Sequence, residues 1–558
     1  MTFTRIRQVA LLVFSMLIAS IIFIQMFLRI DGYITTQFAS MLLLVAILYL
    51  ILWGVLLVKK PFASQVILPC MLILTAIGTA MIARIDKQLG THVALKQLIW
   101  VCVALVLSIL LVIFIDDYRI LRRFSYVSMV IGIVLLLSPM IPGFGKEIGG
   151  ARIWVGFGQH TLQPSEFAKL FLSFFFAAYL FNHRDRLAVG GMKIFKVHLP
   201  RLKDTGPIAI VWAISMGVLV IQHDLGTSLM FFAMFVSMLY VSTGRKSWLA
   251  IGVIAFMIGC FAAVKLFAHV QYRVDAWLHP FDSQIYNRFP GGSAQIVSGL
   301  FGLASGGTMG TGLGKGHPSL TPLANSDFIY ASVGEELGLT GLLAILMLYL
   351  IIITSGIITA MKIKDGFGKL LASGLVFTMA FQVFTVVGGI TLVIPLTGLT
   401  MPYMAAGGSS LVANYILVAI LVVISNAANK PEAAVMSDTF QYEALAALRE
   451  RELQERADAA QNREKENDYE NEDYDDLDSD ESSSYSDSGS SDLYENSSSD
   501  SSSSDSSSSD SSSSDSEDYE KASDLYENRQ LDDDLWPELV VPSLNISNHS
   551  ANRGDSDE

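Results

Sequence analysis

Cysteine is scarce in this sequence, with only Cys70, Cys102 and Cys260 among 558 residues. Each of the three lies inside an apolar run, and none has a partner at the spacing of a metal or redox motif. We therefore expect the three thiols to pack in an apolar interior. The sequence also contains no arrangement typical of a serine or cysteine nucleophile, a zinc site or nucleic-acid readout.

Charged residues are few as well, and they are unevenly distributed. Asp, Glu, Lys and Arg make up 16% of the chain and hydrophobic residues 52%, and the mean hydropathy is +0.47. From Asn429 onward the chain carries 37 acidic and 9 basic residues, so this tail has a net charge of −28, which leaves +14 for the preceding part because the total is −14. A basic and strongly apolar body is typical of an integral membrane protein beside anionic lipids.

A cleavable signal peptide is not expected either. Arg5 and Arg7 precede an apolar run that is too long for a signal peptide, and no small-residue cleavage site follows it. Runs of about 17 to 23 apolar residues are long enough to cross a bilayer as helices. The sequence therefore predicts an all-α polytopic membrane protein with about twelve transmembrane helices, near Val9–Ile30, Gln37–Val58, Gln65–Ala83, Leu98–Ile115, Tyr126–Ile141, Ser165–Leu180, Pro207–Ile221, Thr227–Val241, Leu249–Phe267, Gly341–Ile358, Leu370–Ile390 and Ser410–Ile424.

Lysine and arginine concentrate in alternate loops, for example at Lys59 and Lys60, at Arg122 and Arg123, and at Lys362. Because cytoplasmic loops carry the excess of basic residues, this pattern predicts that both termini are cytoplasmic. The one large loop, residues 268–327, then faces the outside of the cell.

The chain divides into three expected parts. Residues 1–64 form an N-terminal transmembrane pair, residues 65–428 the transmembrane core with its external loop, and residues 429–558 a cytoplasmic tail. In the tail, Phe440–Arg463 has a charged helical pattern, and the Ser/Asp-rich repeats beyond it cannot bury enough apolar surface to fold. The repeats are expected to be disordered, either as a solvating tail or as a docking or phosphorylation segment.

Ionisable residues beside membrane spans are candidates for function because they are costly to place there. Glu166 and Lys169 lie three residues apart at the start of an expected span, after Pro164, so they can pair on one helical face. Arg152 and Trp154 come just before them and favour a functional interpretation. The alternative is a local ion pair with a helix cap. Farther along the chain, a very short link between two spans contains Asp224, which either caps the following helix or belongs to a site.

The external loop carries the remaining candidates. Arg273, Asp275 and Asp282 surround a Pro-Phe turn, and Asp327 and the pair Glu335-Glu336 flank the start of a span. The alternative for these acids is solvated loop charge or a complement to a helix N-terminus. A carboxylate could act as a base here and an Arg or Lys could stabilise an anionic leaving group, which suits chemistry on a lipid-linked substrate.

The loop also contains the glycine-rich run GGTMGTGLGKG. It does not fit a phosphate-binding P-loop, because Lys315 is followed by Gly316 rather than Ser or Thr and Met309 replaces the first glycine. We expect this run to be a flexible loop, with contact to a lipid phosphate left open.

At these residues the chain resembles the SEDS family (shape, elongation, division and sporulation proteins), the group of RodA and FtsW. The matching pieces, in consistent order between Leu98 and Asn426, are GARIWVGFGQHTLQPSEFAK, QHDLGT, YRVDAWLHPFD, the glycine-rich run, PLANSDFIYASVGEELGLTG and PLTGLTMPYMAAGGSSL. The pieces NSDF and AAGG are closer to the RodA-like branch.

The resemblance implies a peptidoglycan glycosyltransferase of the bacterial cytoplasmic membrane. Such enzymes polymerise lipid II and work with a class B penicillin-binding protein transpeptidase. The family's catalytic aspartate follows the Trp-x-x-Pro turn, which puts this role on Asp282, although the acid usually lies one residue farther from the proline. The residues that the resemblance and the charge pattern together assign to substrate binding are Arg152, Trp154, Glu166, Lys169, Asp224, Arg273, Asp327 and Glu335.

Two other functions stay open from the sequence. The many spans with buried charge fit a transporter that moves lipid II across the membrane, although no internal repeat is visible between the two halves. The long tail fits a non-catalytic scaffold of the cell-wall machinery. The cofactor is unknown, with a divalent cation as one alternative. No nucleic-acid partner is expected.

Overall fold

The computed structural model describes residues 2–29, 36–148, 151–157, 160–184, 192–194, 197–199, 202–288, 291–431, 451 and 453–456. The chain divides into two units, Met1–Glu452 and Leu453–Glu558. Of the second unit, residues 453–456 are described, and they are helical. The predictions for Phe440–Arg463 and for the Ser/Asp-rich repeats therefore lie outside the described residues, except at 451 and 453–456. The first unit contains all the helices and strands described below.

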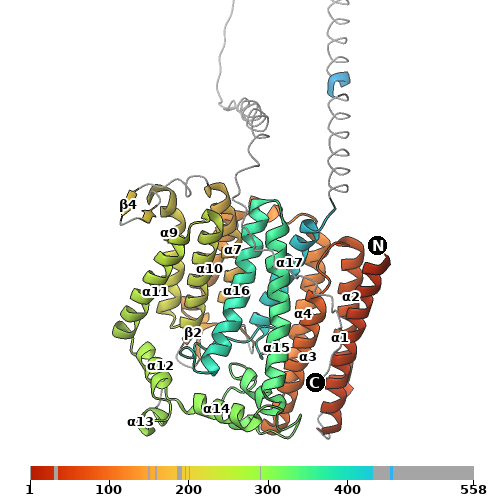
Figure 1. Ribbon diagram of the computed structural model, residues 1–558, viewed down its shortest axis with the longest axis vertical. Coiled ribbons are helices and arrows are strands. Elements are labelled where there is room, and N and C mark those ends of the chain that lie inside the picture. The colour runs from red at the N-terminus through yellow and green to blue at the C-terminus, as the bar shows by residue number, and fades with distance from the viewer. Residues whose placement is uncertain are drawn as a thin grey trace, which may run out of the picture. The chain divides into compact units, whose positions relative to one another are not determined.

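This unit is a bundle of long apolar helices (Figure 1). Ten helices of the described ranges are long and apolar enough to cross a membrane: α1 (Thr2–Arg29), α2 (Thr36–Lys59), α3 (Ile67–Leu89), α4 (Val93–Phe114), α7 (Pro164–Asn182), α10 (Leu225–Thr243), α11 (Lys246–Leu266), α15 (Ile329–Lys362), α16 (Gly366–Ile390) and α17 (Gly408–Ala428). The protein is a multi-pass membrane protein, as the sequence predicts.

Two expected spans correspond to shorter helices. Tyr126–Ile141 falls on α6 (Ser125–Leu137) and the 3₁₀ turn η1 (Ser138–Met140), and Pro207–Ile221 falls on α9 (Leu202–Ile221). Their apolar stretches, Ser125–Met140 and Ile208–Ile221, are 10–17 residues long, below the 18 residues required of a candidate span. The remaining helical elements are short and lie in loops: α5 (Ile120–Arg123), α12 (Ala268–Leu278), α13 (Ser283–Tyr286), α14 (Ala294–Gly306) and η2 (Pro318–Leu320).

The centre of the bundle is formed by α3, α7, α16 and α17, whose side chains are mostly buried, whereas α2 and α11 leave most of theirs exposed. Exposed apolar side chains on the outer helices match a surrounding of lipid tails. Small residues let the inner helices approach closely. At Gly356 of α15, a Cβ atom would lie 2.2 Å from Cγ2 of Val376 on α16.

Within the described ranges, five short strands accompany the helices. β1 (Gly145–Ile148), β2 (Ala151–Phe157) and β3 (His160–Leu162) form an antiparallel sheet, and β4 (Met192–Ile194) pairs with β5 (Val197–Leu199). Strands this short show little of the alternating pattern that predicts a strand. The sequence instead indicated the helix that begins at Pro164, after these strands. The sheet belongs to the site, since the backbone N–H of Arg152 donates to the carbonyl of Gln222 in the α9–α10 link at 3.3 Å.

Helix α15 begins earlier than the span expected at Gly341–Ile358 and is interrupted at Gly338, where φ is 68° and ψ −172°. Glu335 and Glu336 therefore lie within the first helical segment, before the interruption. A Cβ atom at Gly338 would lie 2.3 Å from the backbone nitrogen of Gly310, so the break lets the glycine-rich run pack directly against α15.

Candidate functional site

The Glu166–Lys169 pair is buried at the start of α7, where Pro164 occupies the first helical turn. Nζ of Lys169 lies 2.6 Å from Oε2 of Glu166, and the lysine is fully buried. It also donates to Oε1 of Gln382 at 3.0 Å and to Oδ1 of Asn414 at 3.4 Å. A buried charge needs this many partners to offset its lost hydration. The pair therefore connects α7, α16 and α17 rather than forming a surface contact.

Asp224 caps helix α10 and also keeps an unused oxygen. Its side chain accepts a hydrogen bond from the backbone N–H of Thr227 at 3.0 Å, so the cap predicted from the sequence is present. Its other oxygen, Oδ2, is buried and has no hydrogen-bond partner among the described residues, and the same is true of the Thr227 hydroxyl. Burial raises the pKa of Asp224. Buried polar atoms without a partner are costly, which marks this turn as a place for a ligand group.

Arg273 and Asp327 join Asp224 in one electrostatic cluster. Burial lowers the pKa of Arg273, and the two carboxylates of Asp224 and Asp327 oppose that shift. Burial raises the pKa of Asp327 to about 7, against the effect of Arg273. Asp224 also interacts with Glu166, so this cluster of alternating charge adjoins the Glu166–Lys169 pair. Helices α7, α10 and α12 and the segment before α15 thus bring together five of the predicted residues.

The segment 391–407, between α16 and α17, holds α12 in place. Nη1 of Arg273 donates to the carbonyl of Leu396 at 3.0 Å, and Nε1 of Trp277 donates to the carbonyl of Leu392 at 2.9 Å. These two bonds fix one face of α12, and with it the direction of the Arg273 guanidinium.

The same segment packs against the start of α10, just after Asp224, and lies close to Asp327. Gly226, next to Asp224 on α10, packs so closely that a Cβ atom there would lie 3.0 Å from the carbonyl of Thr397. Gly398 adopts a φ of +77°, and its Cβ position is 3.7 Å from Oδ2 of Asp327. Thr400 has a buried hydroxyl without a hydrogen-bond partner. The site is therefore assembled on this segment.

Several residues of this arrangement are not among those predicted from the sequence. Gln382 and Asn414 are polar residues in the middle of apolar runs, a signal that could have identified them. The carbonyl of Leu396 and the hydroxyl of Thr400 carried no such signal, because their positions follow from the tertiary structure alone.

Arg152 and Trp154 lie on β2, beside the cluster. The Arg152 side chain is exposed and that of Trp154 is half-buried. Through its backbone bond to Gln222, Arg152 is fixed next to the link that contains Asp224. The backbone of β2 is thus placed beside the link that contains Asp224.

Asp282 is not part of the cluster. Its carboxylate is exposed and caps the short helix α13 by accepting a hydrogen bond from the backbone N–H of Gln284 at 2.9 Å. The turn is fixed by the hydroxyl of Ser293, which donates to the carbonyl of Pro280 at 2.6 Å. The neighbouring acid Asp275 is engaged differently, in an ion pair with Arg288 at 3.0 Å. The carboxylate of Asp282 therefore faces solvent, whereas the charge of the Asp275 carboxylate is balanced by Arg288.

Glu335 lies in a separate polar group with Glu336 and the glycine-rich run. Oε1 of Glu335 accepts from the backbone N–H of His317 at 2.6 Å, and Oε2 of Glu336 accepts from that of Gly314 at 2.8 Å. Arg84 of α3 lies 3.3 Å from Glu336 and donates to the carbonyl of Gly314. The run is thus held by many hydrogen bonds, in contrast to the flexible loop expected from the sequence. Within the described ranges, no group of three or more His, Cys, Asp or Glu residues is arranged to hold a metal ion.

Fold and site together define a multi-pass membrane protein with a buried, mixed-charge cluster where several helices begin. Residues 59–430 match the FtsW/RodA/SpoVE family, described as cell cycle protein. The chain belongs to this family, and the resemblance seen in its motifs is confirmed.

Two curated relatives are similar over most of their length. The peptidoglycan glycosyltransferase RodA of Mycobacterium tuberculosis is 44% identical over 379 residues, which cover 66% of this chain and 80% of that protein. The RodA of Mycobacterium leprae is 43% identical over 377 residues, with 66% and 79% covered. A chain of a solved peptidoglycan synthase complex, described as coordinating polymerization and crosslinking, is 24% identical with a TM-score of 0.50, covering 64% of this chain and 98% of that one. It supports the fold.

Proposed function

We propose that this protein is a peptidoglycan glycosyltransferase that transfers glycan from a lipid II donor to the 4-hydroxyl of an acceptor GlcNAc and releases undecaprenyl diphosphate. The observation that carries the proposal is the cluster of Asp224, Arg273 and Asp327 beside the Glu166–Lys169 pair. It offers a cation for a diphosphate and buried polar atoms without partners for sugar or phosphate oxygens. The RodA relatives bear the name of this activity and support it over the transporter or scaffold interpretation.

In the proposed mechanism, a carboxylate removes the proton of the acceptor 4-hydroxyl as its oxygen attacks the anomeric carbon of the donor. The bond from that carbon to the diphosphate breaks, and the leaving diphosphate takes the electron pair. Arg273 stabilises the resulting negative charge. Arg152 and Trp154 bind the substrate at the edge of the cluster, and Lys169, saturated by its partners, positions Glu166.

Asp282 is the proposed base, because it follows the Trp-x-x-Pro turn and its exposed carboxylate is accessible to an incoming acceptor. Asp327 is the competing candidate. Its pKa of about 7 suits proton transfer at neutral pH, and it adjoins Arg273. Glu335 does not contact the substrate in this proposal. Its role is to hold the glycine-rich run in place through its hydrogen bond from the backbone N–H of His317.

We further propose that the protein lies in the bacterial cytoplasmic membrane with both termini in the cytoplasm. The positive-inside pattern supports this orientation. The segments that the pattern puts inside also meet in space, since Arg7, the α2–α3 loop, Lys362 and Asn429 line one cavity. Helices α1 and α2, in residues 1–64, are proposed as an addition to the core of residues 65–428, and a class B penicillin-binding protein transpeptidase as the partner.

The test uses the full-length protein with its partner transpeptidase in proteoliposomes that contain labelled lipid II. We expect glycan strands, detected by gel electrophoresis, and their loss in Asp282→Ala. Movement of lipid II across the bilayer without strand formation would support the transporter instead. Normal cell growth with Asp282→Ala, together with impaired growth when residues 479–558 are removed, would support the scaffold.

A further inference from the structure

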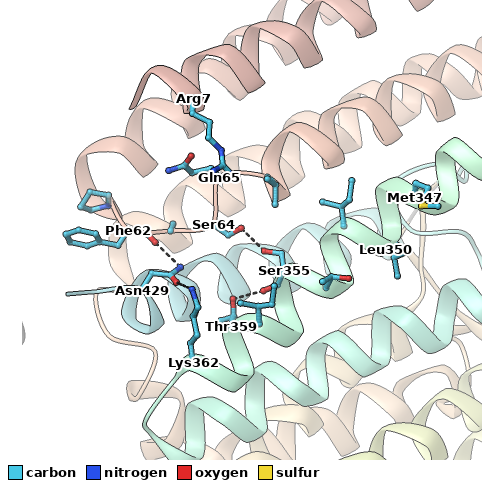
Figure 2. A pocket seen from close by; sticks show the side chains of 16 residues that line it. Arg7, Phe62, Ser64, Gln65, Met347, Leu350, Ser355, Thr359, Lys362 and Asn429 are labelled. Carbon is cyan, nitrogen blue, oxygen red and sulfur yellow. Dashed lines mark hydrogen bonds between the residues drawn. The ribbon is translucent and has the colours of Figure 1, made fainter. Parts of the chain in front are cut away.

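The cavity lined by Arg7, the α2–α3 loop, Lys362 and Asn429 lies at the other end of α15 from the charged cluster. It has a volume of about 740 Å³ and lies between the N-terminal part of α1, the loop from Pro61 to Val66, the last turns of α15 and Asn429 beyond α17. Nothing in the proposed polymerase reaction uses it. Its lining combines an apolar wall with a polar end (Figure 2).

The polar end carries positive charge and, among the residues that the structure describes, no acid. Arg7 of α1 extends toward Gln65 from one side, and Lys362 of α15 extends toward Asn429 from the other (Figure 2). Nζ of Lys362 donates to Oδ1 of Asn429 at 3.2 Å, which leaves the ammonium group further donors. None of the described residues that line the cavity is Asp or Glu. An anionic ligand is therefore favoured.

Between the two cations lie uncharged polar groups. The hydroxyls of Ser64 and Ser355 are hydrogen-bonded to each other at 2.6 Å. Oε1 of Gln65 is buried and has no hydrogen-bond partner in the part of the chain that the structure describes. A buried amide oxygen without a donor is costly, so a ligand that brings a hydroxyl group to this point would satisfy it.

The apolar wall continues along one face of α15. Met347, Leu350, Ile351 and Ile358 follow helical spacing and are 58%, 52%, 42% and 45% exposed. From Met347 to Lys362 the helix rises by about 22 Å, at about 1.5 Å per residue. Half the hydrocarbon core of a bilayer is about 15 Å thick. The wall is thus long enough for one acyl chain that begins near the basic end.

We propose that this cavity binds an anionic glycerophospholipid from the cytoplasmic leaflet. Its phosphate lies between Arg7 and Lys362, a headgroup hydroxyl donates to Gln65, and one acyl chain covers the wall of α15. Basic pockets between helices on the cytoplasmic side of membrane proteins are typical sites for anionic headgroups. The acidic tail of the same chain carries charge complementary to the two cations, but its Ser/Asp-rich repeats at residues 496–516 contain no apolar side chain for the wall. The lipid satisfies both halves of the cavity.

The test is native mass spectrometry of the full-length protein, titrated in detergent with a phosphatidylglycerol and, separately, with a phosphatidylcholine of the same acyl chains. We expect the wild type to retain phosphatidylglycerol and not phosphatidylcholine. The double variant Arg7→Gln/Lys362→Gln should bind phosphatidylglycerol about tenfold more weakly or worse. The matched control is Lys59→Gln/Lys246→Gln, which removes two exposed basic residues on the same expected side, neither of which lines the cavity.

A third variant tests the wall independently of charge. Thr354→Trp places a large side chain in the cavity and should also weaken retention, with an unchanged elution profile in size-exclusion chromatography showing that the protein is folded. Equal retention by the wild type and both cavity variants would overturn the proposal. So would an equal loss in the Lys59/Lys246 control, or a carbodiimide crosslink between Lys362 and the acidic tail in place of lipid retention.

Discussion

At the scale of single residues, Asp327 shows how burial changes an acid. Its pKa rises from an ordinary 3.8 to about 7, so between those pH values the folded protein holds a proton that the unfolded chain has released. The contribution of this group to stability therefore falls as the pH rises through that window. Asp327→Asn removes the titration. We expect the change in melting temperature caused by the substitution to be more positive at about pH 8 than at about pH 5. Thermal unfolding in detergent measures it, and an equal change at both pH values would contradict the assignment.

Lys169 gives a second prediction at this scale. Lys169→Met would leave Glu166 buried without its counter-charge, which typically costs about 3 to 5 kcal/mol of unfolding free energy. The double variant Glu166→Gln/Lys169→Met removes both charges and should recover much of that loss. Thermal unfolding of the two variants checks the pair. If the double variant is no more stable than the single one, the buried pair does not account for the cost.

The sequence indicated several charged residues that the structure brings together, but it did not indicate the residues around them. Glu166, Lys169, Asp224, Arg273 and Asp327 were identified because charge beside an apolar run is expensive. Their partners on the 391–407 segment could not be found in this way, since a backbone carbonyl has no sequence signature. The role of Asp282 stays a prediction, because it depends on a motif and the structure places its carboxylate at the surface.

At the scale of elements, the break in α15 joins the glycine-rich run to the membrane core. Gly338 has a left-handed φ, and a Cβ atom there would overlap the backbone of Gly310. We expect Gly338→Ala to cost about 1 to 3 kcal/mol from the backbone conformation alone, with the overlap adding to it. The control is Gly54→Ala in α2, where nothing lies within 4 Å of the new Cβ atom and a small gain is expected. Similar melting temperatures for the two variants would show that the break is not required.

Hydrophobic runs predicted the long helices well, because a span requires many consecutive apolar residues. They did not predict the β1–β2–β3 sheet or the helical segment from Ile329 to Gly338. These elements are stabilised by contacts with distant parts of the chain, such as Arg152 with Gln222 and the glycine-rich run with Glu336.

Across the molecule, the proposed topology places the charged cluster and the lipid cavity on opposite sides of the membrane. The orientation can be tested with an impermeant thiol reagent on intact and permeabilised cells. Ser283→Cys, beside Asp282, should react in intact cells, whereas Lys59→Cys should react only after permeabilisation. Wild type provides the background from its three cysteines. Labelling of Lys59→Cys in intact cells would reverse the proposed topology.

The most direct measurement of the central claim is the rate of lipid II polymerisation by the full-length protein with its partner transpeptidase. Asp282→Ala, Asp327→Asn and Asp275→Ala are compared under identical conditions. Loss of a general base should lower the rate by about 10²- to 10⁴-fold, so we predict a loss of this size for Asp282→Ala. Asp275→Ala, whose carboxylate is already paired with Arg288, should retain most activity. An Asp282→Ala rate equal to wild type, with Asp327→Asn inactive, would contradict the assignment and move the base to Asp327.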